Sequence, residues 1–134
     1  MDELKQLLLN LKNSLNEYIF EDNSFLDSYC NLIKTNLNTP KQKFKTNLHH
    51  FIPICYYKSL YPSNNENQIK NIADKDSNNI LVNLSYGDHI LAHYYLCLFC
   101  VDKYLYSNLN VAFCSMVFQK SNLIDFNPKK SFLL

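Results

Sequence analysis

Four histidines, all that the chain contains, fall into two pairs, and their spacing constrains the fold more than any other feature. His89 and His93 are four residues apart, so on a helix both side chains lie on one face and can share a cation. His49 and His50 are adjacent, so on an extended strand their side chains point to opposite faces. We therefore expect one of these two to join the metal and the other to act on a substrate.

Length and charge set the limits within which this site must be built. The 134 residues and the 47% hydrophobic content fit one domain with a buried core, so we expect residues 1–134 to form a single unit. The net charge is +1 and every basic residue is a lysine, so no broad electrostatic field toward nucleic acid is predicted. Any contact with phosphates would have to be local.

The cysteines and the N-terminus indicate the compartment. Five cysteines, an odd number within apolar runs, are typical of reduced thiols in a cytoplasmic protein. Cys97 and Cys100 form a single C-x-x-C pair, whereas a structural zinc site usually needs a second one, so we expect buried thiols there. The N-terminus lacks the pattern of a signal peptide, and the most apolar stretch, 90–101, is too short to cross a bilayer. We expect a cytoplasmic protein without a membrane partner.

A stripe of apolar residues at alternating steps of four and three predicts a first helix over about residues 2–20. The stripe would pack against the rest of the domain or, alternatively, form the seam of a homodimer through this N-terminal helix. Ser24 and Asp27 stand at capping-box spacing and predict a second helix that ends before Pro40. The two helices would form a helical hairpin over residues 1–40. The members of the stripe are Leu4, Leu8, Leu11, Leu15 and Tyr18.

The middle of the chain predicts the order strand, loop, strand. Residues 44–50 are expected to form a strand that stops near Pro53. Residues 62–79, rich in Asn, Ser, Lys and Asp, are expected to be a polar loop. Residues 80–84 are apolar and β-branched and predict a second short strand.

Helices are expected to complete the fold. Ser85 and Asp88 stand at capping-box spacing and predict a helix that starts near Tyr86 and carries His89 and His93 close to its beginning. A last helix over 109–118 would belong to a helical extension over 99–134, with a frayed tail at 127–130. The predicted fold class is α+β, mostly helical.

The histidines also predict a type of chemistry. Three imidazoles from one strand and one helix leave a coordination position of the cation open, which is typical of a catalytic metal site. A fourth imidazole, with an ordinary pKa of about 6.5, is suited to take a proton from water. Together these groups predict metal-assisted hydrolysis, in which the free imidazole generates the nucleophile.

Two strings carry a resemblance to a known family: His49-His-Phe-Ile-Pro53, and Asn79-Ile-Leu-Val-Asn-Leu-Ser-Tyr-Gly-Asp-His-Ile-Leu-Ala-His-Tyr-Tyr-Leu96. They are similar to the paired motifs HHI-x-P and N-L-V-x-L-[ST]-x-x-[DE]-H-x-x-A-H-x-x-L of bacterial and phage HNH endonucleases. The resemblance covers roughly residues 43–98. It implies a ββα-metal core, in which a helix crosses a β-hairpin and one divalent ion lies between them.

This family cuts phosphodiester bonds in DNA, so the resemblance implies a hydrolase with DNA as its partner. By position, His49, His89 and His93 would hold the metal and His50 would be the general base. Asn79 would hydrogen-bond across the hairpin loop and orient the base. Relatives are active with Mg or Mn, whereas three imidazoles favour Zn or Ni as the tightest binder.

The chain departs from the family motif at two positions. The family places its asparagine nine residues before the first helix histidine, where this chain has Ile80; a β-bulge would restore Asn79 to the site. With Ile80 there instead, the base would lose its support. Asn47 stands where many relatives carry an acid, and it can still make the local hydrogen bond. The alternative function is therefore a weak or inactive HNH scaffold that binds a partner and keeps a structural metal.

Lysines near the motifs are the candidates for contacts with DNA phosphates. Lys41, Lys43 and Lys45 lead into the first motif, while Lys58 and Lys70 lie between the two motifs. Lysine side chains at such places can bind phosphate oxygens without reading sequence. We expect Lys43, Lys45 and Lys58 in particular to do so.

Overall fold

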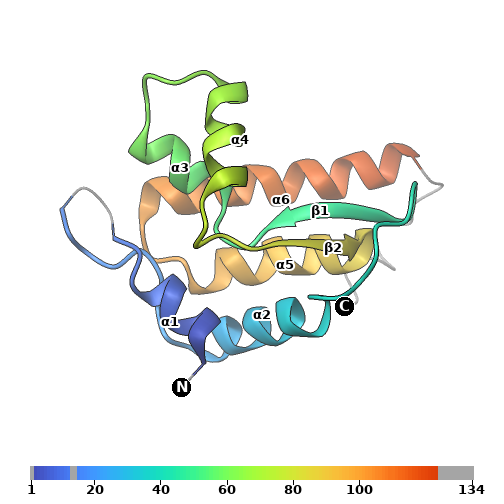
Figure 1. Ribbon diagram of the computed structural model, residues 1–134, viewed down its shortest axis with the longest axis horizontal. Helices are drawn as coiled ribbons and strands as arrows, with labels where there is room; N and C mark the ends of the chain where they lie inside the picture. The colour runs from blue at the N-terminus through green and yellow to red at the C-terminus, as the bar shows by residue number, and fades with distance from the viewer. Residues whose placement is uncertain (1, 13–14, 124–134) are drawn as a thin grey trace.

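The structure, a computed structural model, describes residues 2–12 and 15–123. This part of the chain is an α+β fold, mostly helical, with a two-stranded antiparallel sheet among its helices (Figure 1). In chain order the elements are α1 (Glu3–Leu9), α2 (Ser24–Thr35), β1 (Thr46–His50), α3 (Ile54–Leu60), α4 (Glu66–Lys75), β2 (Leu81–Ser85), α5 (Tyr86–Phe99) and α6 (Lys103–Leu123).

The hairpin of β1 and β2 runs directly into α5. The strands pair in a continuous register from Thr46 opposite Ser85 to His50 opposite Leu81. α5 begins without a linker because the Ser85 hydroxyl accepts a hydrogen bond from the backbone N–H of Asp88 (3.2 Å). This cap, which the spacing of Ser85 and Asp88 predicted, places the first turns of α5 beside the hairpin.

α5 is the central helix of the core. It packs against α2 and α6 and against both strands (Figure 1). Three aromatic rings fill the space between α2, the end of β1 and α5: Tyr29 stacks on Phe51, with ring centroids 5.5 Å apart, and lies tilted against Phe99 at the same distance. All three side chains are fully buried. The hairpin therefore packs against a closely packed hydrophobic core on this side.

The first helix is shorter than the apolar stripe predicts. α1 ends at Leu9, and Lys12 pairs with Tyr18 in an antiparallel bridge. Asn16 has a φ of 62°, a left-handed conformation that asparagine tolerates and that a right-handed helix excludes. The prediction of a helix to residue 20 is therefore wrong beyond Leu9.

Because α1 ends at Leu9, the apolar stripe does not form the continuous helix face on which the homodimer interpretation depended. Leu8 is fully buried in the core of its own chain, whereas Leu15 and Tyr18 are 76% and 55% exposed. Among the described residues the five positions of the stripe do not share one helix face. Leu8 lies in the core and Leu4 and Leu11 pack against it, whereas Leu15 and Tyr18 are exposed.

The interval between the strands is a pair of helices and not the expected polar loop. α3 and α4 pack on each other beside the loop end of the hairpin. α4 is started by a capping box between Asn65 and Gln68, and it buries Ile69 and Ala73. The polar composition of residues 62–79 concealed this short amphipathic helix.

The remaining expectations differ from the structure in extent. α2 begins at Ser24 as expected, but its N-cap is Asn23. α6 starts before the expected residue 109, because the Asp102 carboxylate accepts a hydrogen bond from the Leu105 N–H (2.8 Å). The expected frayed tail lies outside the described residues. None of the described helices is both long and apolar enough to span a membrane.

Candidate metal centre

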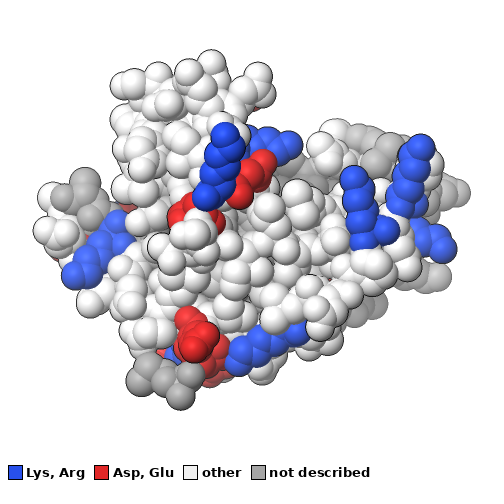
Figure 2. Space-filling view, viewed as in Figure 1, with Lys and Arg blue, Asp and Glu red and all other residues white. Residues whose placement is uncertain are grey.

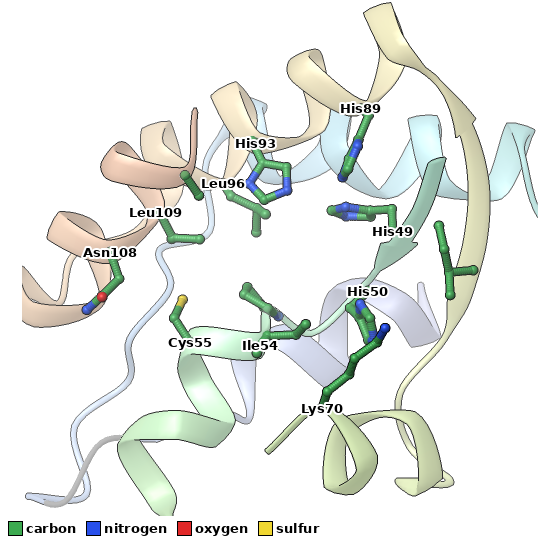
Figure 3. A pocket seen from close by; sticks show the side chains of 13 residues that line it. His49, His50, Ile54, Cys55, Lys70, His89, His93, Leu96, Asn108 and Leu109 are labelled. Carbon is green, nitrogen blue, oxygen red and sulfur yellow. The ribbon is translucent and has the colours of Figure 1, made fainter. Parts of the chain in front are cut away.

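Three of the four histidines converge between the hairpin and α5. His49 comes from β1, and His89 and His93 lie one helical turn apart on α5. One potential ligand atom from each ring lies within 4.8 Å of those of the other two, and the three rings face one another in Figure 3. Among the residues that the structure describes, this is the one group of histidine, cysteine and acidic side chains with such spacing.

The buried hydroxyl of Tyr29 sets the tautomer of His49. The hydroxyl lies 2.7 Å from His49 Nε2 and 2.8 Å from the backbone carbonyl of Phe51. A carbonyl can only accept, so the single hydroxyl proton goes to Phe51 and the hydroxyl oxygen must accept the proton of His49 Nε2–H. Burial raises the pKa of Tyr29 well above its usual value, so this hydroxyl keeps its proton. His49 therefore carries its lone pair on Nδ1, the nitrogen that remains available to a cation.

The two helix histidines are oriented to different degrees. The Nδ1 atom of His89 lies 3.3 Å from the Oδ1 of Asn47, so an Nδ1–H donated to this amide leaves the Nε2 lone pair available. The expectation that Asn47 makes the local hydrogen bond is thus met. The Nδ1 atom of His93 is buried without a partner among the described residues. No protein group there sets the tautomer of His93, so a bound cation can select it.

The electrostatic environment keeps the three rings neutral, as metal ligands must be. Burial, followed by the nearby His93 and His89 rings, lowers the pKa of His49 well below its usual value. Burial and His50 lower the pKa of His89 to about 4, and burial and His89 lower that of His93 to about 3. Three neutral imidazoles fit Zn²⁺, Ni²⁺ or a similar late transition metal and leave positions for water or substrate.

All four histidines line one cavity of about 490 Å³, which lies between the hairpin, α3, α5 and α6. His50 stands apart from the ligand group, next to the side chain of Lys70 (Figure 3). Its Nε2 atom lies 2.6 Å from the Oδ1 of Asp74 on α4. The adjacent histidines of β1 thus have different hydrogen-bond partners, although both line the same cavity.

Asn79 fastens the loop end of the hairpin. Its Oδ1 accepts the backbone N–H of Ile52 (2.7 Å), and its Nδ2 donates to the carbonyl of the same residue (3.3 Å). The described ladder contains no bulge, and Asn79 reaches across from the residue before Ile80 without one. The expected bulge is therefore wrong, while the cross-loop hydrogen bond is present. Ile80 packs against the core.

The lysines are not gathered around the histidines. Lys70 lines the histidine cavity, and Lys58 and Lys70 both line an adjoining cavity of about 430 Å³. Lys43 and Lys45 are exposed in the segment that leads into β1, and Lys43 lies 5.2 Å from the ring centroid of Phe44. Figure 2 shows lysines and acids dispersed over the visible face, without one continuous basic surface.

The cysteines contribute no thiolate to the site. All five are free, and only Cys55 lines the histidine cavity. Burial raises the pKa of Cys55 to about 12, and the pKa values of Cys97 and Cys100 to about 11 and 12. At neutral pH these groups are therefore thiols, so Cys55 is neither an ionised ligand nor an activated nucleophile.

Two side chains that contact the histidines, Tyr29 and Asp74, were not predicted from the sequence. Tyr29 lies 20 residues from His49, and Asp74 lies 24 residues from His50. No local pattern links residues across such intervals. The capping box of Asn65 and Gln68, with the apolar spacing of Ile69 and Ala73, could have revealed α4 and with it the helix that carries Asp74.

The chain matches no protein-family model, no curated protein and no solved structure.

Replacing Tyr29 by Phe should weaken zinc binding by about 10- to 100-fold, because His49 loses the acceptor that holds its Nδ1 lone pair toward the cluster. Isothermal titration calorimetry of the metal-free protein measures this. The matched control is Tyr57→Phe, which removes a hydroxyl bonded to Asp76 (2.7 Å) outside the cluster. Equal zinc affinities for wild type and Tyr29→Phe would contradict the assignment.

The free energy of unfolding of the metal-free protein should fall as pH drops from about 6.5 toward 4. Histidine in the unfolded chain has a pKa of about 6.5, whereas burial lowers those of His89 and His93 to about 4 and 3. The unfolded state therefore binds more protons in this window, and stability is complete only above it. Urea unfolding should show a flatter dependence for a His89→Asn, His93→Asn variant, and equal slopes would refute the prediction.

Proposed function

We propose that β1, β2 and α5 form the ββα-metal core of an HNH-type endonuclease that hydrolyses phosphodiester bonds in DNA. The observation that carries the proposal is the cavity lined by all four histidines, with three rings grouped as a ligand set and His50 held apart from them. The paired motifs of residues 49–53 and 79–96 resemble those of the HNH family, and this resemblance supplies the reaction class.

His49, His89 and His93 would hold one divalent ion. When bound, such an ion stabilises charge on the scissile phosphate and on the 3′ oxygen that leaves. Zn or Ni is proposed as the tightest binder because the protein donors are imidazole nitrogens. Mg or Mn is proposed for activity, with water and phosphate oxygens as the further ligands that these ions prefer.

His50 is the proposed general base. It takes a proton from a water molecule in the cavity, the water oxygen forms a bond to phosphorus, and the bond from phosphorus to the 3′ oxygen breaks. The 3′ oxygen leaves with the electron pair of that bond and takes a proton from solvent water. The products are a 5′ phosphate and a 3′ hydroxyl. Asn79 supports this step indirectly, because its two hydrogen bonds to Ile52 fasten the loop that begins directly after His50.

DNA contact is proposed to be local. Lys70 and Lys58 line the two adjoining cavities and are suited to phosphates close to the scissile bond. Lys43 and Lys45 would contact phosphates near the start of β1. The dispersed charges of Figure 2 supply no long basic surface on the visible face, so a few lysines would carry much of the electrostatic affinity. A cytoplasmic setting, consistent with five free cysteines, belongs to the same proposal.

Replacing His50 by Ala should lower plasmid cleavage by about 10²- to 10⁴-fold, the usual contribution of a general base. Nicking assays with Mn, Mg, Ni and Zn measure the rate. Zinc affinity should remain that of the wild type, since His50 is outside the ligand group. The matched control, His93→Ala, should lose both zinc binding and cleavage.

Cleavage by His50→Ala at the wild-type rate would remove His50 from the role of base. A wild-type protein that binds zinc but cuts DNA with none of the four ions would favour the alternative function, an inactive HNH scaffold with a structural metal.

Replacing Lys70 by Ala should weaken DNA binding and reduce the slope of log affinity against log salt by about 1, as expected for the loss of one phosphate contact. Fluorescence anisotropy with labelled duplexes across a salt series measures both quantities. The control is Lys75→Ala on the same helix, since Lys75 lines neither of the two cavities. The same salt slope for wild type and Lys70→Ala would argue against a phosphate contact.

A further inference from the structure

His50 at the end of β1 contacts Asp74 near the end of α4. His50 Nε2 and Asp74 Oδ1 are 2.6 Å apart, and the two side chains are 10% and 36% exposed. The pair joins the end of β1 to α4, one of the two helices that lie between the hairpin strands in sequence. A short, partly buried contact of this kind restrains the ring more strongly than an exposed surface pair would.

The carboxylate is carried by a helix that is anchored at several points. The capping box of Asn65 and Gln68 starts α4, and the Ala73 side chain, next to Asp74, is fully buried. Beyond the helix end, Asp76 accepts a hydrogen bond from Tyr57 of α3 (2.7 Å). Asp74 thus projects from a packed element and can position a neighbouring ring.

The chemistry of the pair determines which nitrogen of His50 carries the proton. An ionised carboxylate accepts hydrogen bonds and donates none, so the atom facing Asp74 must be Nε2–H. In a neutral imidazole the lone pair then resides on Nδ1. No hydrogen bond to His50 Nδ1 occurs in the described part of the chain, so this lone pair is available to a water molecule in the cavity that His50 lines.

We propose that Asp74 is the positioning residue of His50: it holds the ring in the Nε2–H tautomer and makes Nδ1 the atom that takes the proton from water. The role of Nδ1 in taking the proton rests on the proposed nuclease function. The Nε2–H tautomer does not depend on that function. A carboxylate that accepts a hydrogen bond from an imidazole N–H in this way fixes the tautomer and the direction of the ring.

The first experiment observes the tautomer without any reaction. Long-range ¹H–¹⁵N NMR spectra of the metal-free protein, recorded above the ordinary histidine pKa, distinguish Nε2–H from Nδ1–H rings, and His50→Gln assigns the signals. The wild type should show His50 as Nε2–H, and Asp74→Ala should show a mixture. An Nδ1–H ring in the wild type, or an unchanged tautomer in Asp74→Ala, would overturn the positioning role.

The second experiment is a double-mutant cycle in DNA cleavage. Asp74→Ala should lower kcat by at least about tenfold, within the 10²–10⁴ that a general base contributes, and leave KM and zinc affinity unchanged. In the His50→Ala background the same substitution should have no further effect, because Asp74 acts through His50. Asp74→Glu should restore part of the rate. Equal fold-losses in both backgrounds would assign Asp74 a general structural role and overturn the proposal.

The control variant is Glu66→Gln, which removes one negative charge from the same helix at an exposed position. Its kcat should equal that of the wild type, so a loss shared by Glu66→Gln and Asp74→Ala would trace to charge alone and count against positioning. If the wild type cuts no DNA with any ion, the nuclease proposal and the proton-accepting role of Nδ1 fail together. The NMR spectra then still decide whether Asp74 holds the tautomer.

Discussion

The hydroxyl of Tyr29 is the contact on which the histidine site depends. One oxygen atom links α2 to the last part of β1 and to the residue that follows the strand, by accepting from His49 and donating to the Phe51 carbonyl. Its ring stacks on Phe51 inside the core, so the packing of α2 and the direction of His49 cannot vary independently. α2 is therefore part of the site's support, although no candidate ligand comes from it.

The region between the strands also orients a histidine of β1. A tight turn would have closed the hairpin at a lower cost in chain entropy than the helical insert that separates its strands. The insert supplies what a tight turn could not: α4 carries Asp74 to His50, and Asn79 ties the end of the insert to the Ile52 backbone. The two histidines of β1 are thus oriented by different elements, His49 by α2 and His50 by α4.

The parts of the fold and site that could be predicted are those encoded within a few residues. Ser85 specifies the cap, so the start of α5 follows from a local rule. The four-residue spacing from His89 to His93 places both on one helix face, so this candidate ligand pair also follows from a local rule. The overlong first helix shows the limit, because the left-handed backbone at Asn16 interrupts a periodic pattern. Asn65 caps α4 in a segment whose polar composition is typical of loops, so composition alone predicted a loop there. Asp74 acts only through tertiary structure, which no local spacing reports.

The placement of the three candidate ligand histidines would connect any bound cation to the folding equilibrium. An unfolded chain can offer the pair on α5 only transiently, and His49 is 40 residues away from His89 in sequence. Full coordination therefore requires the hairpin, α5 and the Tyr29 contact to be in place together. A cation that binds the folded state alone adds about 2.7 kcal/mol to stability at a free concentration 100 times its dissociation constant. Metal supply would then govern how much of this chain is folded, as well as whether its site is complete.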